Sequence, residues 1–139
     1  MDSVIVWSNE NGAVSVCYPT GELPVDQVLE KDCPPEAIIV NANSLPQNQG
    51  IFFEAWELID NSVKVNLNKA KTIAHNIRRA RRAEEFAPLD KIIAAQIPGN
   101  DFAQAEVQRQ IIRDKYSLIQ QQIDDAQTPD EIIQAIGGE

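Results

Sequence analysis

The sequence predicts an α+β protein in which a small β-rich N-terminal head with one short helix precedes a helical C-terminal part. In the first half of the chain, short runs of β-branched and apolar residues alternate with Asn, Gly and Pro turn residues. After Leu67 the apolar residues recur at intervals of three and four, which is the period of a helix. We therefore place the boundary at Asn66 and Leu67, with a head over residues 1–66 and a helical region over residues 67–139.

The head is expected to contain roughly five short strands and one short helix. Asn11-Gly12 favours positive φ at both central positions of a hairpin turn, and Asp60-Asn61 is expected to form a second turn. Pro24 can occupy the first helical position of a helix that ends at Cys33. The expected strands are Val4–Trp7, Val14–Tyr18, Ala37–Val40, Trp56–Ile59 and Val63–Val65, with a loop over Asn41–Gly50.

The first long helix is expected to start at Leu67, with the Asn66 side chain capping its exposed amides. Pro88 should kink or restart this helix because proline lacks a backbone donor, and Pro98-Gly99 should end it. A narrow, alanine-rich seam is predicted along the helix, failing only at Glu84. The seam residues are Ala70, Ile73, Ile77, Ala80 and Ala87.

A second long helix, capped by Asn100 or Asp101 and spanning about residues 101–126, shows the strongest periodicity of the chain. Its apolar residues hold the a and d positions of a heptad that only Arg109 interrupts. Such a helix needs a partner, which is either the preceding helix of the same chain or further copies in a coiled coil. The self-association seam would comprise Phe102, Ala105, Ile112, Tyr116, Ile119, Ile123 and Ala126.

A short terminal helix over about residues 129–136 is predicted by a specific capping pattern. Thr128 can serve as the N-cap, Pro129 fits the first helical position, and Glu131 can bond back to the cap. Gly137 should end this helix.

Charge and composition argue against several classes of function. The net charge is −9, and Met1–Asn66 holds ten acidic residues against two basic ones. Nucleic-acid binding is disfavoured, because phosphate contacts need a surplus of Lys and Arg. No apolar stretch is long enough to span a bilayer and no targeting segment is evident, so we expect a soluble, cytosolic protein. Cys17 and Cys33 are too few for a disulfide scaffold or a zinc site, and reduced thiols are expected.

Catalytic and cofactor chemistry finds few candidates. His75 is the only histidine, and no cysteine or carboxylate stands at ligand spacing on its helix, so a surface or packing role is expected. Asp124 and Asp125 are adjacent on a helix and point in different directions, so we expect both to be solvated. No glycine-rich phosphate loop is present. We therefore expect a non-enzymatic protein with no catalytic residues, no metal and no cofactor.

Two groups of side chains are candidates for binding a partner. The arginine run either pairs with acids nearby, such as Glu84, Glu85 or those of the head, or forms a basic band that grips an acidic partner. Phe52 and Phe53 cannot both face inward if their segment is extended, so one of them can mark an interface. The candidate partner-binding residues are Phe52, Phe53, Trp56, Arg78, Arg79, Arg81 and Arg82.

Residues 53–90 resemble a group of small tailed-phage and prophage proteins. In that group a Phe-x-x-Ala-Trp strand, a Val-x-Val-(Asp/Asn)-(Met/Leu)-x-Lys-Ala helix start and an arginine-rich helix follow in this order. This chain has Phe53-Glu54-Ala55-Trp56, then Val63-Lys64-Val65-Asn66-Leu67-Asn68-Lys69-Ala70, then Ile73-Ala74-His75-Asn76-Ile77-Arg78-Arg79-Ala80-Arg81, and finally Pro88-Leu89-Asp90. It departs from the group at Glu84-Glu85-Phe86, where the group tends to continue its helix.

The resemblance implies a protein encoded near tail-fibre genes, either a fibre assembly chaperone or a small structural subunit of the fibre. The implied partner is a trimeric tail fibre, which favours a homotrimer if the protein self-associates. The implied location is the host cytoplasm during assembly or the virion tail, with no membrane. The alternative is a regulatory or nucleic-acid-associated adaptor that uses the arginine-rich helix.

Overall fold

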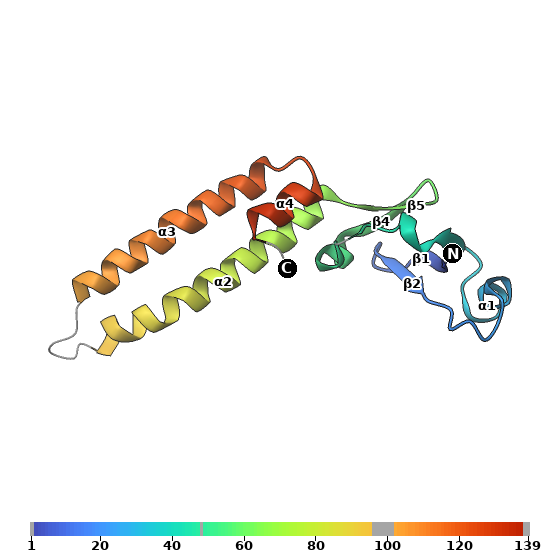
Figure 1. The fold of residues 1–139 in the computed structure, drawn as a ribbon, viewed down its shortest axis with the longest axis horizontal. Helices are drawn as coiled ribbons and strands as arrows, with labels where there is room; N and C mark the ends of the chain where they lie inside the picture. The colour runs from blue at the N-terminus through green and yellow to red at the C-terminus, as the bar shows by residue number, and fades with distance from the viewer. Residues whose placement is uncertain (1, 48, 96–101, 138–139) are drawn as a thin grey trace. The chain divides into compact units, whose positions relative to one another are not determined.

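A computed structural model of the chain describes residues 2–47, 49–95 and 102–137. The chain has an α+β fold, with short antiparallel strands in its N-terminal part and helices in its C-terminal part (Figure 1). It divides into two compact units, Met1–Ala70 and Lys71–Glu139. The division falls one helical turn after the boundary expected at Asn66 and Leu67, inside the first turn of a helix that begins at Leu67.

The described part of the first unit contains five strands in two antiparallel sheets. One sheet has the strand order β2-β1-β3, and the other pairs β4 with β5. All five expected strands form, and each end lies within one residue of its predicted position. The bounds are β1 Ser3–Ser8, β2 Val14–Cys17, β3 Ile38–Asn41, β4 Trp56–Ile59 and β5 Ser62–Val65.

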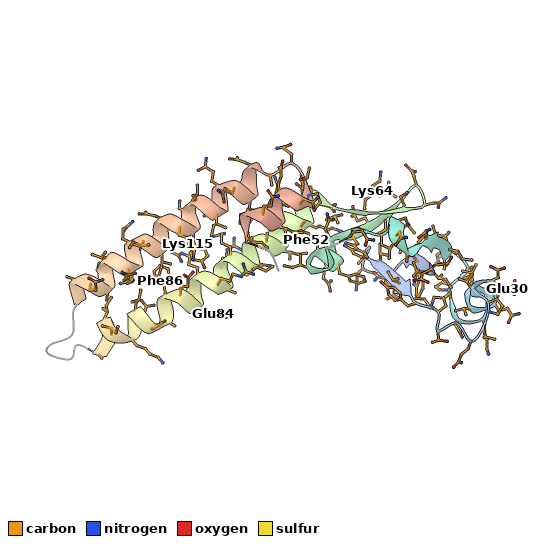
Figure 2. The ribbon with its side chains drawn as sticks, in the orientation of Figure 1. Glu30, Phe52, Lys64, Glu84, Phe86 and Lys115 are labelled. Carbon is orange, nitrogen blue, oxygen red and sulfur yellow. The ribbon has the colours of Figure 1, made fainter. Side chains whose placement is uncertain are left out.

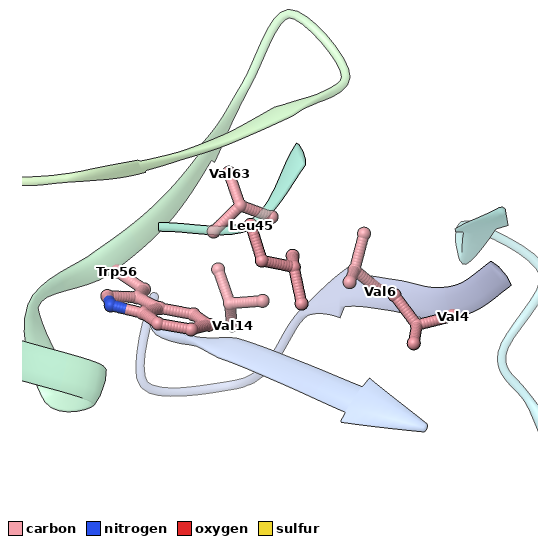
Figure 3. Close-up of a cluster of buried hydrophobic side chains, with 6 residues drawn as sticks. All are labelled: Val4, Val6, Val14, Leu45, Trp56 and Val63. Carbon is pink, nitrogen blue, oxygen red and sulfur yellow. The ribbon is translucent and has the colours of Figure 1, made fainter. Parts of the chain in front are cut away.

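The core of this unit lies between the two sheets and the segment that connects them. Its buried side chains come from β1, β2, β4, β5 and the loop after β3 (Figure 3). Ile5 is also fully buried, so the central strand β1 is buried on both of its faces. Burial of each aliphatic side chain contributes about 1.5–3 kcal/mol. The cluster comprises Val4, Val6, Val14, Leu45, Trp56 and Val63.

The two hairpin turns are built differently. Asp60 and Asn61 have φ of 51° and 64°, as a two-residue turn between β4 and β5 requires. In the turn between β1 and β2, Gly12 has positive φ (79°) but Asn11 does not, so the prediction of positive φ at both positions is wrong. The Asn9 side chain explains the difference, because its Oδ1 accepts from the amides of Asn11 (3.0 Å) and Ala13 (3.2 Å) and shapes a longer turn.

Short helices complete the first unit. Helix α1 spans Val25–Asp32, with Pro24 at the N-cap rather than at the first helical position. The segment expected to be a loop holds the 3-10 helix η1 (Ala42–Ser44), and a second one, η2 (Gly50–Ala55), leads into β4. Phe53 therefore lies in a helical turn, and Phe52 lies at a kink within η2 (φ −101°, ψ 19°), so the segment is not extended.

The cysteines are both free and half-buried. Cys17 ends β2, and Cys33 is the C-cap of α1. Burial raises the pKa of the Cys33 thiol, and the neighbouring Cys17 thiol raises it further. Cys33 is therefore less reactive as a nucleophile than an exposed thiol.

The helical part contains α2 (Leu67–Ala95), α3 (Phe102–Asp125) and α4 (Pro129–Ala135). As predicted, Asn66 caps α2, because its Oδ1 accepts from the amide of Lys69 at 3.0 Å. Of the two predicted effects of Pro88, a kink or a restart of the helix, the restart is wrong, since α2 continues through Pro88. Proline removes one backbone donor, and α3 holds α2 on both sides of this position through Glu85 and Asp90. The predicted stop at Pro98-Gly99 and the cap at Asn100 or Asp101 lie outside the described residues.

Helix α4 begins with the expected cap. Thr128 Oγ1 accepts from the amide of Glu131 at 3.2 Å. The Glu131 carboxylate reaches one residue past the cap, where it accepts from the amide of Gln127 at 2.6 Å. The helix ends at Ala135, and Gly137 follows it with φ of 81°.

Helices α2 and α3 form an antiparallel hairpin (Figure 1), so the seam of α3 closes within one chain. Ion pairs join Glu85 to Lys115 (3.0 Å) and Asp90 to Arg109 (3.4 Å), which accounts for the charged residue in the heptad. The side chain of Phe102 lies outside the described set. Of the other predicted seam residues, Ile112 and Ile119 are half-buried, and those buried are Ala105, Tyr116, Ile123 and Ala126.

The predicted alanine seam of α2 is wrong over its second half. Ala80 and Ala87 are exposed, although Ala70 is fully buried. The face that α2 turns toward α3 instead carries Arg78 and Glu85. Long polar side chains can cover apolar surface with their stems and bond across the hairpin with their ends, which small alanines cannot do.

Candidate partner-binding surfaces

A hollow of about 400 Å³ lies between α2 and α3, and arginines make up half of its lining residues. Arg78, Arg79 and Arg82 project from α2, and Arg113 projects from α3. Hydrogen-bonding side chains of α3 complete the lining. These residues form the arginine groove: Arg78, Arg79, Arg82, Arg113, Tyr116, Ser117 and Gln120.

Neighbours on α2 orient two of the groove's guanidinium groups. Arg79 donates to Asn76 Oδ1 at 3.1 Å. The Arg82 guanidinium lies 4.7 Å from the centroid of the Phe86 ring, which is a cation–π contact. In Figure 2, Phe86 and Lys115 lie between the two helices, whereas Glu84 points away from α3.

The other two guanidinium groups are held in the same way. Arg78 Nε donates to His75 Nδ1 at 3.2 Å. Arg113 donates to Glu106 Oε1 and Gln110 Oε1, both at 3.0 Å. Each arginine of the groove is thus fixed by a partner on its own helix, while other N–H groups of the planar fork are not engaged by these contacts.

Three of these arginines form no ion pair with any described carboxylate. Within the part of the chain that the structure describes, no carboxylate lies within 4.0 Å of Arg78, Arg79 or Arg82. For these three arginines, the alternative of pairing with Glu85 is wrong, because Glu85 bonds across the hairpin to α3. Burial lowers the pKa of Arg78, and the positive charges of Arg79 and Arg82 lower it further. The groove therefore concentrates positive charge in an otherwise acidic protein.

His75 positions Arg78 through a hydrogen bond. Its Nε2 lies 2.8 Å from Asp124 Oδ1, so Asp124, whose side chain is 58% exposed as predicted, is also paired. Because Nδ1 accepts from Arg78, this arrangement requires the neutral imidazole with its proton on Nε2. The histidine is a positioning residue, and the described residues include no group of three metal-ligating side chains.

Arg81 separates from the predicted band. It lines a second hollow of about 170 Å³ with Tyr116, Ile119 and Ile136, and it donates to the carbonyl of Ile136. Arg81 thus ties α2 to the end of α4 and serves packing. The sequence grouped four arginines, but the structure brings three of them together with Arg113, which is distant in the sequence.

The aromatic candidates also separate. Phe52 is fully buried and Trp56 is 5% exposed, so both are core residues and cannot meet a partner from these positions. Phe53 is 40% exposed, and its ring lies 4.9 Å from that of Trp56 at 50°. Of the three, Phe53 alone remains accessible.

A second surface, the outer stripe, was missed from the sequence. Val107, Ile111 and Leu118 lie on an exposed side of α3, away from its buried seam, with exposures of 53%, 54% and 57%. Their spacings of four and seven place them on one line of the helix, and this signal was available in the sequence. The heptad of the buried seam is more regular, and it dominates the apolar pattern of α3.

Comparisons with protein-family models, with curated proteins and with solved structures found no match. Among the described residues, no helix is both long and apolar enough to cross a bilayer. Function must therefore be inferred from the chemistry of the arginine groove and the outer stripe.

Proposed function

We propose that the protein is a non-enzymatic, tail-fibre-associated protein that acts by binding another protein, as an assembly chaperone or a small structural subunit of the fibre. The observation that supports this proposal is the exposed apolar line of the outer stripe. The hairpin closes its own seam without Val107, Ile111 or Leu118, so these residues do not serve the fold. Exposed apolar residues that adjoin one another mark interaction sites more often than residues scattered singly.

The shape of the stripe indicates the kind of contact. Residues on one line of a long helix form the apolar edge that a partner helix or groove can cover. Asp114 lies between Ile111 and Leu118, and its carboxylate accepts from Gln110 at 2.9 Å. A partner that covers the stripe would therefore place a polar or basic group opposite Asp114.

The identity of the partner follows from the resemblance of residues 53–90 to the tailed-phage group. We propose a trimeric tail fibre as that partner, with binding in the host cytoplasm during assembly or retention in the virion tail. A trimer-matched stoichiometry follows, with one copy of this chain on each fibre subunit.

Co-expression of this protein with the product of the adjacent tail-fibre gene tests the proposal. We expect the fibre to be soluble and trimeric only when this chain is present, and a complex of the two to survive gel filtration. The proposal fails if the fibre is soluble and trimeric by itself and no complex is recovered.

A further inference from the structure

We infer that the arginine groove is a binding site for a carboxylate-rich segment of a partner protein. Arg79, Arg82, Arg113 and the nearly buried Arg78 line the hollow, and Ser117 and Gln120 add neutral hydrogen-bonding groups. A guanidinium presents its donors in a planar fork that matches both oxygens of a carboxylate. The groove thus offers several such forks within one hollow of about 400 Å³.

The site is organised before any ligand arrives. Arg79 is held by Asn76, Arg82 stacks on Phe86, and Arg113 is held by its own helix. Each of these contacts engages only part of the guanidinium group. The remaining N–H donors of the arginine are not used by it. Pre-oriented side chains lose little rotamer entropy on binding, which is a large cost for flexible arginines.

The charge of the groove favours an anion. Arg78 is only 8% exposed, and it has two cationic neighbours, Arg79 and Arg82, without a described carboxylate in ion-pair distance. Burial, and then the repulsion from Arg79 and Arg82, lower the pKa of Arg78, and Asp124 offsets only part of this. Bound carboxylates would relieve the repulsion. An acidic ligand therefore gains both hydrogen bonds and relief of repulsion.

Protein carboxylates fit this site better than a nucleic acid. Counting Lys71–Glu139 gives nine basic residues against eleven acidic ones, so the helical unit has a net charge of −2. A nucleic-acid strand spreads its charge along an extended path and needs a continuous basic surface. The arginine groove is a confined basic spot, and Glu106 and Asp114 lie on the same helix as Arg113.

The inference is independent of the outer stripe, because the two surfaces share no residue. Fluorescence anisotropy with a dye-labelled hexaglutamate peptide at low salt tests it on the full-length protein, with an oligothymidylate of equal charge as the competing probe. We expect the peptide to bind, and we expect added salt to lower its affinity for the protein. Arg79→Gln and Arg82→Gln should each weaken it about tenfold, since each removes charge-assisted hydrogen bonds.

Three variants make the result specific. Lys91→Gln removes one positive charge from α2 outside the groove and should change the affinity less than twofold. Arg113→Gln removes the groove arginine that α3 contributes and should also weaken binding. This result would show that the losses do not come from a local change in the structure of α2. Ile111→Ser should leave peptide binding unchanged, which separates this site from the outer stripe. The inference is overturned if the peptide does not bind, if Lys91→Gln weakens binding as much as Arg82→Gln, or if oligothymidylate binds more tightly than the peptide.

Discussion

The hydroxyl of Tyr116 on α3 donates to the carboxylate of Glu85 on α2, and this bond joins the two helices beside the arginine groove. Lys115 donates to both oxygens of the same carboxylate, at 3.0 Å and 3.2 Å. Burial of the tyrosine and its bond to Glu85 raise the pKa of Tyr116 to about 12. The Glu85 carboxylate therefore bonds to α3 and does not neutralise the arginines of the groove.

Removing the Tyr116 hydroxyl should destabilise the hairpin. Tyr116→Phe keeps the buried ring but leaves Glu85 with Lys115 alone, and we expect the free energy of unfolding to fall by about 1 kcal/mol. Urea unfolding followed by circular dichroism measures this change. Tyr18→Phe is the control, because Tyr18 is 65% exposed, and an equal loss there would contradict the role of the bond.

Acid should weaken the same contact. Hydrogen bonds from Tyr116 and Lys115 lower the pKa of Glu85 below its ordinary value of 4.5. A carboxyl whose folded pKa is depressed contributes stability above its unfolded pKa, and this contribution is lost as the pH falls through the folded value. The free energy of unfolding should therefore drop below about pH 4.5, and Glu85→Gln should flatten part of the drop. Glu84→Gln, on the exposed side of α2, should leave the profile unchanged.

Alkaline pH gives a separate test of Tyr116. Because its folded pKa is about 12 against an ordinary 10, the stability from the neutral phenol is complete below pH 10 and is lost as the pH rises toward 12. Ultraviolet titration of the Tyr18→Phe variant isolates the ionisation of Tyr116. A midpoint at the ordinary value in the folded protein would show that the bond to Glu85 does not form.

Truncating a side chain should lower the free energy of unfolding on the buried side of α3 but not on its exposed side. Ile123 is fully buried, so Ile123→Ala should lower the free energy of unfolding by about 2–5 kcal/mol. Ile111 is 54% exposed on the outer stripe, and Ile111→Ala should change it by less than about 0.5 kcal/mol. Equal losses for the two substitutions would mean that the outer stripe is packed in the free protein.

Local signals made much of the fold predictable from the sequence. Strand ends followed from β-branched runs and turn residues, and the caps at Asn66 and Thr128 involve side chains that bond within three residues of themselves. Some failures were local, such as the β1–β2 turn that the Asn9 side chain shapes, but the larger ones came where a distant segment decides the structure. Pro88 is tolerated inside α2, where contacts from α3 flank it, and the inner face of α2 follows the positions of Tyr116 and Lys115 on α3.

The candidate site was predictable only in part for the same reason. The arginine run was visible, but its division between a groove and a packing role for Arg81 depends on α3 and α4. Arg113 joins the groove through the hairpin, and spacing in the sequence contains no sign of it. Phe52 and Phe53 differ in burial, as expected for an extended segment, but the segment is a kinked 3-10 helix rather than a strand.

The most direct test of the proposed function is the amount of fibre that elutes with the Ile111→Ser variant in gel filtration after co-expression. Ile59→Ser is the matched control, since Ile59 is 45% exposed but lies on β4. We predict that Ile111→Ser loses the fibre while keeping the stability and helix content of the wild type, and that Ile59→Ser retains it. Undiminished fibre binding by a folded Ile111→Ser variant would contradict the assignment of the outer stripe as the partner-binding surface.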